Sequence, residues 1–335
     1  MLQNPTADRS GVPRLGRTTA AALAAALAVV VALGPRPRVA DAWTEPTPGP
    51  DLDAWLAGLE AGVPRLRAGE AKGVVWANPD ARARTPLAVV YLHGFSADRH
   101  EVEPLVSDLA RDLGANAFFT RLAGHGQDGA AMAEASVQDW MADAAEAVAV
   151  GARLGERVVL VGTSTGATLA LWAAARPESV DRTAALVLVS PNLGLRDPSS
   201  RVLLWPWGGL IARAVAGAER CFEPENEAQA LHWTNCYPTR ALLPMAALVA
   251  HVRALDPGRV GAPTLVVYSR QDAVVDPTET ERSLAGLGGG APTFFLVEDS
   301  GDPAHHLIAG EIMSPRTTDR VRERILEFLD SAVAP

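Results

Sequence analysis

The sequence contains almost no lysine: Lys72 is the only one among 30 basic residues. Acidic residues outnumber basic ones, and the formal net charge is -9. Residues 1–42 carry five Arg and two Asp, a net +3, so the rest of the chain stands at -12. Proteins that bind nucleic acids need clustered Lys and Arg to contact phosphates. The acidic body of the chain therefore argues against a nucleic-acid partner.

The sequence also lacks the short motifs that hold metals and phosphate-bearing cofactors. It has no H-E-x-x-H, no C-x-x-C pair and no Walker-type phosphate loop. We therefore predict that the protein uses neither a metal nor a cofactor.

Cysteine is equally scarce, since Cys221 and Cys236 are the only two and both lie in one segment. In an oxidising compartment they would form a disulfide. Closing a loop of about 15 residues would then stabilise the fold by roughly 3 kcal/mol. Two unpaired buried thiols are the alternative.

The N-terminal apolar run, Thr18–Leu33, is shorter than the about 20 residues that a membrane span requires. The basic residues before it are Arg9, Arg14 and Arg17. Ala40-Asp41-Ala42 offers small residues at the spacing that a signal peptidase reads. We predict that residues 1–42 are a signal peptide and that the protein is exported, periplasmic or secreted. An uncleaved membrane anchor and a cytoplasmic protein are the alternatives.

From residue 86 onward, short apolar runs alternate with segments of helical periodicity. Leu87–Leu92 is an apolar run short enough for a buried strand, and Val137–Leu154 has apolar residues on one helical face. Further strands are predicted at 116–120, 157–161, 184–189, 264–268 and 293–297, and a short one precedes the regular pattern at 73–77. This alternation predicts an α/β fold with a mainly parallel sheet covered by helices on both faces.

Residues 196–246 interrupt the alternation and hold three tryptophans and both cysteines. We interpret this segment as a cap over the active site; a helical crossover with buried aromatic residues is the alternative. Its apolar residues Leu203, Leu204, Leu210 and Ile211 would line an acyl pocket or form the cap's own core. The remaining predicted parts are an N-terminal extension at 43–85 and a core divided between 86–195 and 247–335.

The strongest chemical signal is Gly162-Thr163-Ser164-Thr165-Gly166, directly after the apolar run Val158–Val161. A G-x-S-x-G pattern between a buried strand and a helix is typical of a nucleophile elbow, a sharp turn that exposes the serine hydroxyl. Gly162 and Gly166 fit because a side chain at either position would clash with strand or helix backbone. The pattern predicts Ser164 as a nucleophile.

A second signal, His93-Gly94-Phe95, follows the apolar run that ends at Leu92. In folds with a nucleophile elbow, the loop at this place supplies one donor of the oxyanion hole, and the residue after the serine supplies the other. We therefore predict the N–H groups of Phe95 and Thr165 as the two donors. Gly94 would let the backbone approach a substrate, and His93 would hold the loop.

A serine nucleophile needs a base and a carboxylate that orients the base, and both follow the serine in this fold. Asp272 lies just beyond the predicted strand at 264–268. Asp276 is the rival, but it precedes Pro277 and would cap a helix that starts there. We favour Asp272 as the acid.

Two adjacent histidines, His305 and His306, follow the last predicted strand, and only one can be the base. The apolar pair Leu307-Ile308 directly after His306 would anchor that residue against the core. We favour His306 and keep His305 as the alternative.

Five motifs now form an ordered series. They are Leu92-His93-Gly94-Phe95, Leu122-Ala123-Gly124-His125-Gly126, Val137-Gln138-Asp139-Trp140, Gly162-Thr163-Ser164-Thr165-Gly166 and Asp272-Ala273-Val274-Val275. Together they resemble the monoacylglycerol lipase and carboxylesterase branch of the α/β-hydrolases, also grouped with the S33-type serine hydrolases, over roughly residues 86–330. The resemblance implies an α/β-hydrolase fold with a helical cap inserted after the sixth strand, no cofactor, and hydrolysis of acyl esters. One departure is the final loop, residues 300–306, which is longer than the usual Ser-Gly-His approach.

These features predict a serine hydrolase that cleaves a small-molecule carboxylic ester, lipid-like or monoacylglycerol-like, through an acyl-enzyme. A proline-iminopeptidase-like serine peptidase would use the same residues and would need acidic groups to hold a substrate amine. The predicted cap offers four of them: Glu219, Glu223, Glu225 and Glu227. A non-catalytic binding protein on the same fold is the third possibility.

Overall fold

A central sheet of seven strands organises the computed structural model, which describes residues 16–333. The strand order is β1-β3-β2-β4-β5-β8-β9. β1 runs antiparallel to β3, and every other neighbouring pair is parallel. The strands are β1 (Gly73–Val75), β2 (Thr85–Leu92), β3 (Asn116–Phe119), β4 (Gly155–Thr163), β5 (Thr183–Val189), β8 (Thr264–Tyr268) and β9 (Thr293–Leu296). The prediction of a mainly parallel sheet is confirmed.

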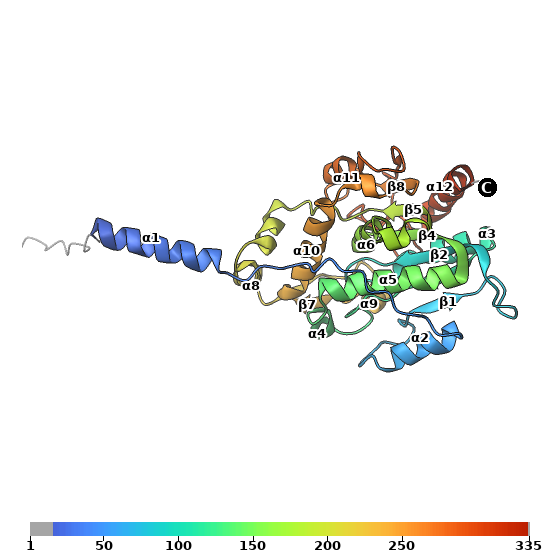
Figure 1. Cartoon of the computed structure of the whole chain (residues 1–335), viewed down its shortest axis with the longest axis horizontal. Helices are drawn as coiled ribbons and strands as arrows, with labels where there is room; N and C mark the ends of the chain where they lie inside the picture. Colours follow the sequence, from blue (N-terminus) through green and yellow to red (C-terminus); the bar gives the residue numbers. More distant parts are fainter. Residues whose placement is uncertain (1–15, 334–335) are drawn as a thin grey trace, which may run out of the picture.

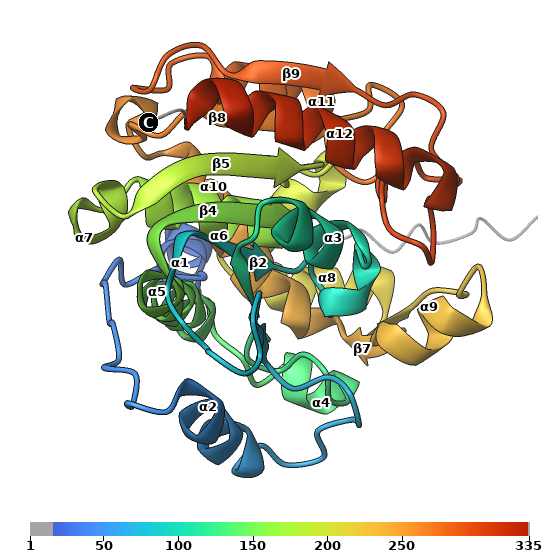
Figure 2. The same cartoon turned by 90° about the vertical axis from the view of Figure 1, so that its right-hand side faces the viewer.

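Helices cover both faces of this sheet (Figures 1 and 2). Along β2, Val90 and Leu92 point to one face, where they share a core with α5, α6 and α10; Val89 and Tyr91 point to the other, towards α3 and α12. Burial on both faces explains why the strands are continuously apolar. The helices outside the insertion are α2 (Leu52–Ala61), η1 (Arg99–Glu101), α3 (Leu105–Asp112), α4 (Gly129–Met132), α5 (Val137–Leu154), α6 (Thr165–Ala174), α7 (Pro177–Val180), α10 (Leu242–Arg253), η4 (Pro257–Arg259), α11 (Pro277–Leu284) and α12 (Pro315–Ala332).

The chain between β5 and α10 forms a separate layer beside the carboxyl ends of the strands. Its elements are η2 (Pro198–Leu204), α8 (Gly208–Ala216), β6 (Glu219–Cys221), α9 (Glu227–His232), β7 (Cys236–Pro238) and η3 (Thr239–Ala241). β6 and β7 pair antiparallel with Cys221 opposite Cys236, and the two cysteines form a disulfide. We call residues 196–241 the cap, because α10 packs against α6 in the core and so belongs to the core.

The position of the insertion differs from the family expectation in one respect. The cap follows β5, the fifth strand in chain order, rather than a sixth. The count is lower because, within residues 16–333, a single short strand, β1, precedes the parallel series.

The N-terminal helix α1 (Arg17–Ala32) projects away from the rest of the molecule (Figure 1). Its apolar side chains are largely exposed, for example Leu27 at 64%. No helix within residues 16–333 is both long enough and apolar enough to cross a membrane. Arg9 and Arg14 of the predicted basic segment lie outside the described residues.

The segment after α1 packs against the body of the protein. Asp41, inside the predicted cleavage motif, accepts a hydrogen bond from the Trp172 indole and pairs with Arg176, each at 2.9 Å. Trp43 stacks on Trp172 with ring centroids 5.5 Å apart. Residues 41–43 are thus bound to α6 and the turn that follows it.

Two buried ion pairs fix the N-terminal extension to the core. The Glu60 carboxylate receives two hydrogen bonds from Arg121, at 2.7 and 2.8 Å. Lys72, the only lysine, donates to Glu146 of α5 at 2.6 Å. Removing one partner of such a pair leaves an uncompensated buried charge, which costs about 3–5 kcal/mol.

Candidate active site

Ser164 lies in a strained turn between β4 and α6. Its backbone has φ 51° and ψ -113°, which a residue with a side chain rarely adopts. The turn is held by hydrogen bonds from the Ser164 N–H to Val189 O at 2.9 Å and from Asn192 N–H to Ser164 O at 3.1 Å. The G-x-S-x-G pattern therefore forms the sharp strand-to-helix turn that it predicts.

The flanking glycines are required by close backbone contacts. A Cβ at Gly162 would lie 2.6 Å from the backbone of Gly166, and a Cβ at Gly166 would lie 2.0 Å from the carbonyl oxygen of Leu92. A side chain at Gly162 would push β4 away from α6, and one at Gly166 would push α6 away from β2. Either change would displace Ser164.

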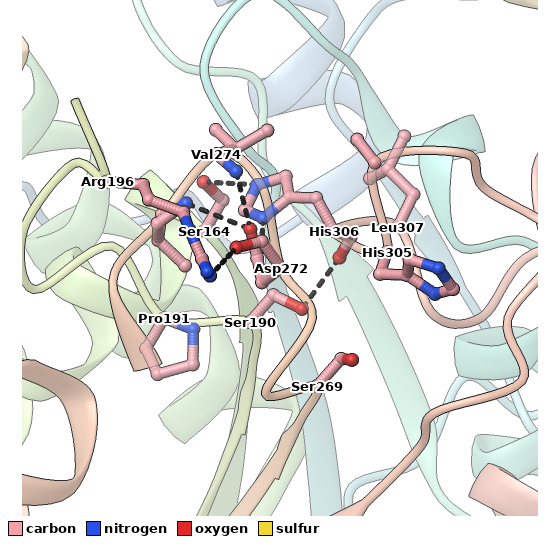
Figure 3. A network of polar contacts seen from close by, with 12 residues as sticks. Ser164, Ser190, Pro191, Arg196, Ser269, Asp272, Val274, His305, His306 and Leu307 are labelled. Atoms are coloured by element: carbon pink, nitrogen blue, oxygen red, sulfur yellow. Dashed lines mark hydrogen bonds and ion pairs between the residues drawn. The ribbon is translucent and has the colours of Figure 1, made fainter. Parts of the chain in front are cut away.

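Three side chains converge at this turn (Figure 3). Ser164 Oγ lies 3.0 Å from His306 Nε2, and His306 Nδ1 lies 2.8 Å from Asp272 Oδ2. Because a carboxylate can only accept, the neutral imidazole carries its proton on Nδ1, and Nε2 is left to accept from the serine hydroxyl. This is the geometry of a nucleophile, a base and an orienting acid.

Backbone N–H groups fix both the Asp272 carboxylate and the loop of His306. The second oxygen of Asp272, Oδ1, accepts from the N–H groups of Val274 and Val275 at 2.8 and 2.9 Å. Asp302 Oδ2 accepts from the N–H groups of His306 and Leu307 at 2.9 and 2.7 Å. Asp302 thus shapes the loop that carries the imidazole.

The two rival residues have other partners. Asp276 caps α11 by accepting from the Thr278 N–H at 2.9 Å, as its place before Pro277 predicts. His305 has a left-handed backbone with φ 52°, and its ring contacts Ser300 Oγ at 3.1 Å. In Figure 3 the His305 ring points away from Ser164, whereas the His306 ring points toward it.

The loop after β2 passes close to Ser164 at Gly94. The Leu122 N–H donates to His93 Nε2 at 3.0 Å, so the ring proton is on Nδ1, which donates to Gly94 O at 2.9 Å. Burial lowers the pKa of His93 to about 4, so the ring stays neutral. A Cβ at Gly94 would lie 3.5 Å from the Ser164 Cβ. His93 holds this loop, and Phe95 and Thr165 line the same pocket as Ser164.

The pocket that contains Ser164 and His306 has a volume of about 1130 Å³. The cap supplies much of its apolar wall, including Leu203, Ile211, Trp205 and Trp233. Of the four cap residues singled out in the sequence, Leu204 and Leu210 do not line it. The cap glutamates divide similarly, since Glu223 and Glu225 line the pocket while Glu219 and Glu227 do not.

Comparison with known proteins gives the family. The family described as serine aminopeptidase, S33 (Hydrolase_4) matches residues 83–299. The chain belongs to this family. The match spans the core and the cap, with Ser164 and Asp272, and ends just before the loop of His306.

Relatives of this S33 chain include a thermostable monoacylglycerol lipase from Bacillus sp. strain H-257. The two are 25% identical over 253 residues, which cover 75% of this chain and 94% of the relative. Among solved structures, one described under the metagenome-derived lipolytic enzymes LipS and LipT matches with a TM-score of 0.64 at 23% identity. The match covers 79% of this chain and 99% of the other. A soluble variant of monoglyceride lipase from Saccharomyces cerevisiae matches with a TM-score of 0.61 at 13% identity, covering 79% and 92%. The predicted α/β-hydrolase fold and resemblance to the lipase and esterase branch are confirmed.

Opposing effects set the pKa of His306. Burial alone would lower it, but the charge of Asp272 and the hydrogen bond to it, followed by the charge of Asp302, raise the pKa above 6.5. The imidazole therefore gains a proton readily, as a general base must.

Glu101 is a buried carboxyl group that was not singled out in the sequence. It is 2% exposed, and its Oε1 accepts from the Gly94 N–H and, at 2.7 Å, from the Tyr91 hydroxyl. Burial raises the pKa of Glu101 to about 8, so at neutral pH it is mostly the uncharged acid. We assign Glu101 as a positioning residue for the loop that carries Phe95.

Proposed function

We propose that the protein is a carboxylic ester hydrolase that works through an acyl-enzyme on Ser164. The observation that carries this proposal is the hydrogen-bonded series Ser164–His306–Asp272, at a strained turn that opens into an apolar pocket. Membership of the S33 family and the lipase names of several relatives support it.

In the proposed mechanism, His306 Nε2 takes the proton from Ser164 as its oxygen attacks the ester carbonyl carbon. Asp272 keeps the ring proton on Nδ1 and stabilises the imidazolium. The Phe95 and Thr165 N–H groups would receive the carbonyl oxygen as it becomes negative, each contributing on the order of 3 kcal/mol. The alcohol leaves with the proton from His306. Water, deprotonated by the same base, then releases the acid and restores Ser164.

The pocket favours an ester with a substantial acyl chain. Apolar walls suit acyl chains, and a cavity of about 1130 Å³ lies just above the usual range for small-molecule sites. Monoacylglycerol-like lipids are the substrate class that we propose.

The test is hydrolysis of p-nitrophenyl esters of increasing chain length, with proline-naphthylamide as the amide arm. We expect Ser164→Ala to lose activity on every ester, by about 10⁴-fold or more, while its thermal unfolding stays close to that of the wild type. Wild-type turnover by the purified variant would overturn the proposal. Faster cleavage of the amide than of the best ester would favour a peptidase instead.

We also propose that the protein is exported. The support is the basic segment, the short apolar run and the Ala40-Asp41-Ala42 motif in the sequence. Mass spectrometry of the mature N-terminus in the native host decides between cleavage after Ala42, an uncleaved anchor and a cytoplasmic chain.

A further inference from the structure

A second polar cluster lies outside the triad, where the cap meets the core. We call it the Glu70 cluster: Glu70, Asp98, His100 and His232. Glu70 belongs to the N-terminal extension, and His232 to the last turn of α9 in the cap. Asp98 and His100 come from the connection after β2, where Asp98 caps η1 and His100 lies within it. The proposed mechanism uses none of them.

The four side chains turn their ligand atoms toward one another. One potential ligand atom from each residue lies within 4.8 Å of all the others. His232 Nδ1 lies 3.1 Å from both Glu70 Oε1 and Asp98 Oδ2. The two imidazole rings stack with their centroids 4.0 Å apart. For metal–ligand bonds of about 2.0–2.1 Å, the edge of a tetrahedral zinc site is about 3.3 Å, close to the two distances from His232 Nδ1.

The cluster has too few protein donors for Glu70. Asp98 Oδ1 accepts from the His100 N–H at 2.7 Å and lies 2.9 Å from His100 Nδ1, whereas Glu70 shares the one Nδ1 of His232 with Asp98. Glu70 and Asp98 are 3% and 1% exposed, and Glu70 Oε2 is buried without a hydrogen-bond partner. Within residues 16–333, neither carboxylate pairs with Arg67 or Arg99, the nearest guanidinium groups. Arg67 instead donates to the backbone carbonyls of His232 and Trp233.

A proton on His232 leaves this arrangement incomplete. A single Nδ1–H cannot point at two carboxylate oxygens that are both 3.1 Å away, and it does not reach Glu70 Oε2. A divalent cation between the four groups would contact all of them and neutralise both carboxylates. Two imidazoles with two carboxylates suit zinc better than calcium or magnesium, which prefer oxygen ligands.

We propose that the Glu70 cluster binds a structural zinc ion that ties the cap to the loop beside the active site. Four protein ligands would close the coordination sphere, as in structural zinc sites. The neighbouring residues already bridge the same two parts: Ala97 and Trp233 share one small apolar core, and the Thr234 N–H donates to Ser96 O at 2.8 Å. The metal would thus reinforce a contact on which the walls of the pocket depend.

This proposal reverses the prediction from sequence that no metal is used. The ligands stand at positions 70, 98, 100 and 232, and no short motif spans them. Only the docking of the cap and of the N-terminal extension brings them together.

The experiment uses the full chain, purified without a histidine tag and freed of metal with a chelator. Zinc chloride is titrated against a chromogenic competitor, and thermal unfolding is followed with and without the metal. Wild type should bind one zinc ion per chain, and its melting temperature should rise by several degrees. Glu70→Gln and His232→Asn each remove one ligand and should weaken zinc binding by about 100-fold or more, beyond the 10–100-fold typical of second-sphere changes.

His251→Asn is the matched control. The His251 side chain is exposed to a similar degree, 21% against 18% for His232, but it contacts Asp41 instead. The His251→Asn variant should bind zinc with the same affinity as the wild type. In a second measurement, cobalt is added to the metal-free wild type in place of zinc. We expect the visible absorption of a tetrahedral cobalt site. This measurement uses no variant, so it does not depend on whether a variant folds.

Two results would overturn the proposal. One is a wild type that binds zinc no better than His232→Asn and shows no tetrahedral cobalt spectrum. The other is a melting temperature that is unaffected by zinc and chelator yet drops in His232→Asn. This second result would mean that Glu70, Asp98 and His232 form an ionic contact that holds a shared proton and no metal.

Discussion

The triad and the Glu70 cluster are assembled in different ways. Ser164, Asp272 and His306 follow β4, β8 and β9, so the parallel sheet itself brings them to one edge. The Glu70 cluster depends on three segments that the sheet does not order: the extension, the loop after β2 and the cap. The residues that follow the strands should keep their geometry when the cap is destabilised. The Glu70 cluster should not, because one of its residues belongs to the cap.

The largest expected effect is on the triad side of this comparison. Asp272→Asn would place an amide N–H₂ against His306 Nδ1 and favour the wrong tautomer, so kcat should fall by about 10⁴-fold. Steady-state hydrolysis of p-nitrophenyl butyrate measures it.

The matched control for that substitution is Asp276→Asn. Asn caps a helix as well as Asp does, so α11 and the activity should stay within about twofold of wild type. Equal losses in the two variants would mean that the acid has been misassigned.

A smaller effect is expected at Glu101, which supports the oxyanion loop without touching the reacting atoms. Glu101→Leu leaves the Gly94 N–H without its acceptor, while the Tyr91 hydroxyl keeps Thr163 Oγ1 at 2.9 Å. The value of kcat should fall about 10- to 100-fold, less than the loss of an oxyanion donor. Glu101→Gln keeps the acceptor and mimics the uncharged acid, so it should restore most of the activity at pH 7. If Gln were as damaging as Leu, a charged carboxylate would be required and the positioning role would be wrong.

The pH dependence of ester hydrolysis reports on the protonation of His306. The base must be neutral, and its folded-state pKa is raised above 6.5. The value of kcat/KM should therefore fall by up to about tenfold per pH unit below that pKa, with its half-maximum above pH 6.5. His305→Gln should leave the profile in place. A half-maximum well below pH 6.5 would contradict the ring environment described for His306.

The smallest effect on catalysis is expected in the cap. Replacing both Cys221 and Cys236 by Ser opens a loop with a sequence separation of 15, so the cap should lose roughly 3 kcal/mol in the chain-entropy model. Activity on p-nitrophenyl acetate should change by about twofold at most, because the triad stands on the sheet. Local unfolding of the cap is measured by hydrogen exchange. Loss of acetate hydrolysis would show that the triad depends on the cap.

The sequence predicted what the strands determine. Ser164, Asp272 and His306 each follow an apolar run that predicts a strand, and the order of those strands places them together. The helix Val137–Leu154 was also predicted with its observed bounds, from the apolar residues on one of its faces. The structure adds a reciprocal cap between Ser136 and Asp139 at its start.

What depends on tertiary contacts was not predicted. Glu101 and Asp302 are ordinary loop acids in the sequence, and their roles arise from N–H groups that meet them only in the folded chain. The short cap elements, such as α9 and the β6–β7 pair, have too few residues for a periodic pattern. The buried pairing of Lys72 with Glu146 was likewise not predicted, because the two residues are 74 positions apart and no sequence motif joins them.

The most direct test of the central claim is labelling with a fluorophosphonate, followed by peptide mapping. The account predicts one adduct per chain, on Ser164, with loss of ester hydrolysis in proportion to labelling. It also predicts much slower labelling of His306→Gln and unchanged labelling of His305→Gln. An active enzyme that stays unlabelled, or one that carries its adduct on another serine, would contradict it.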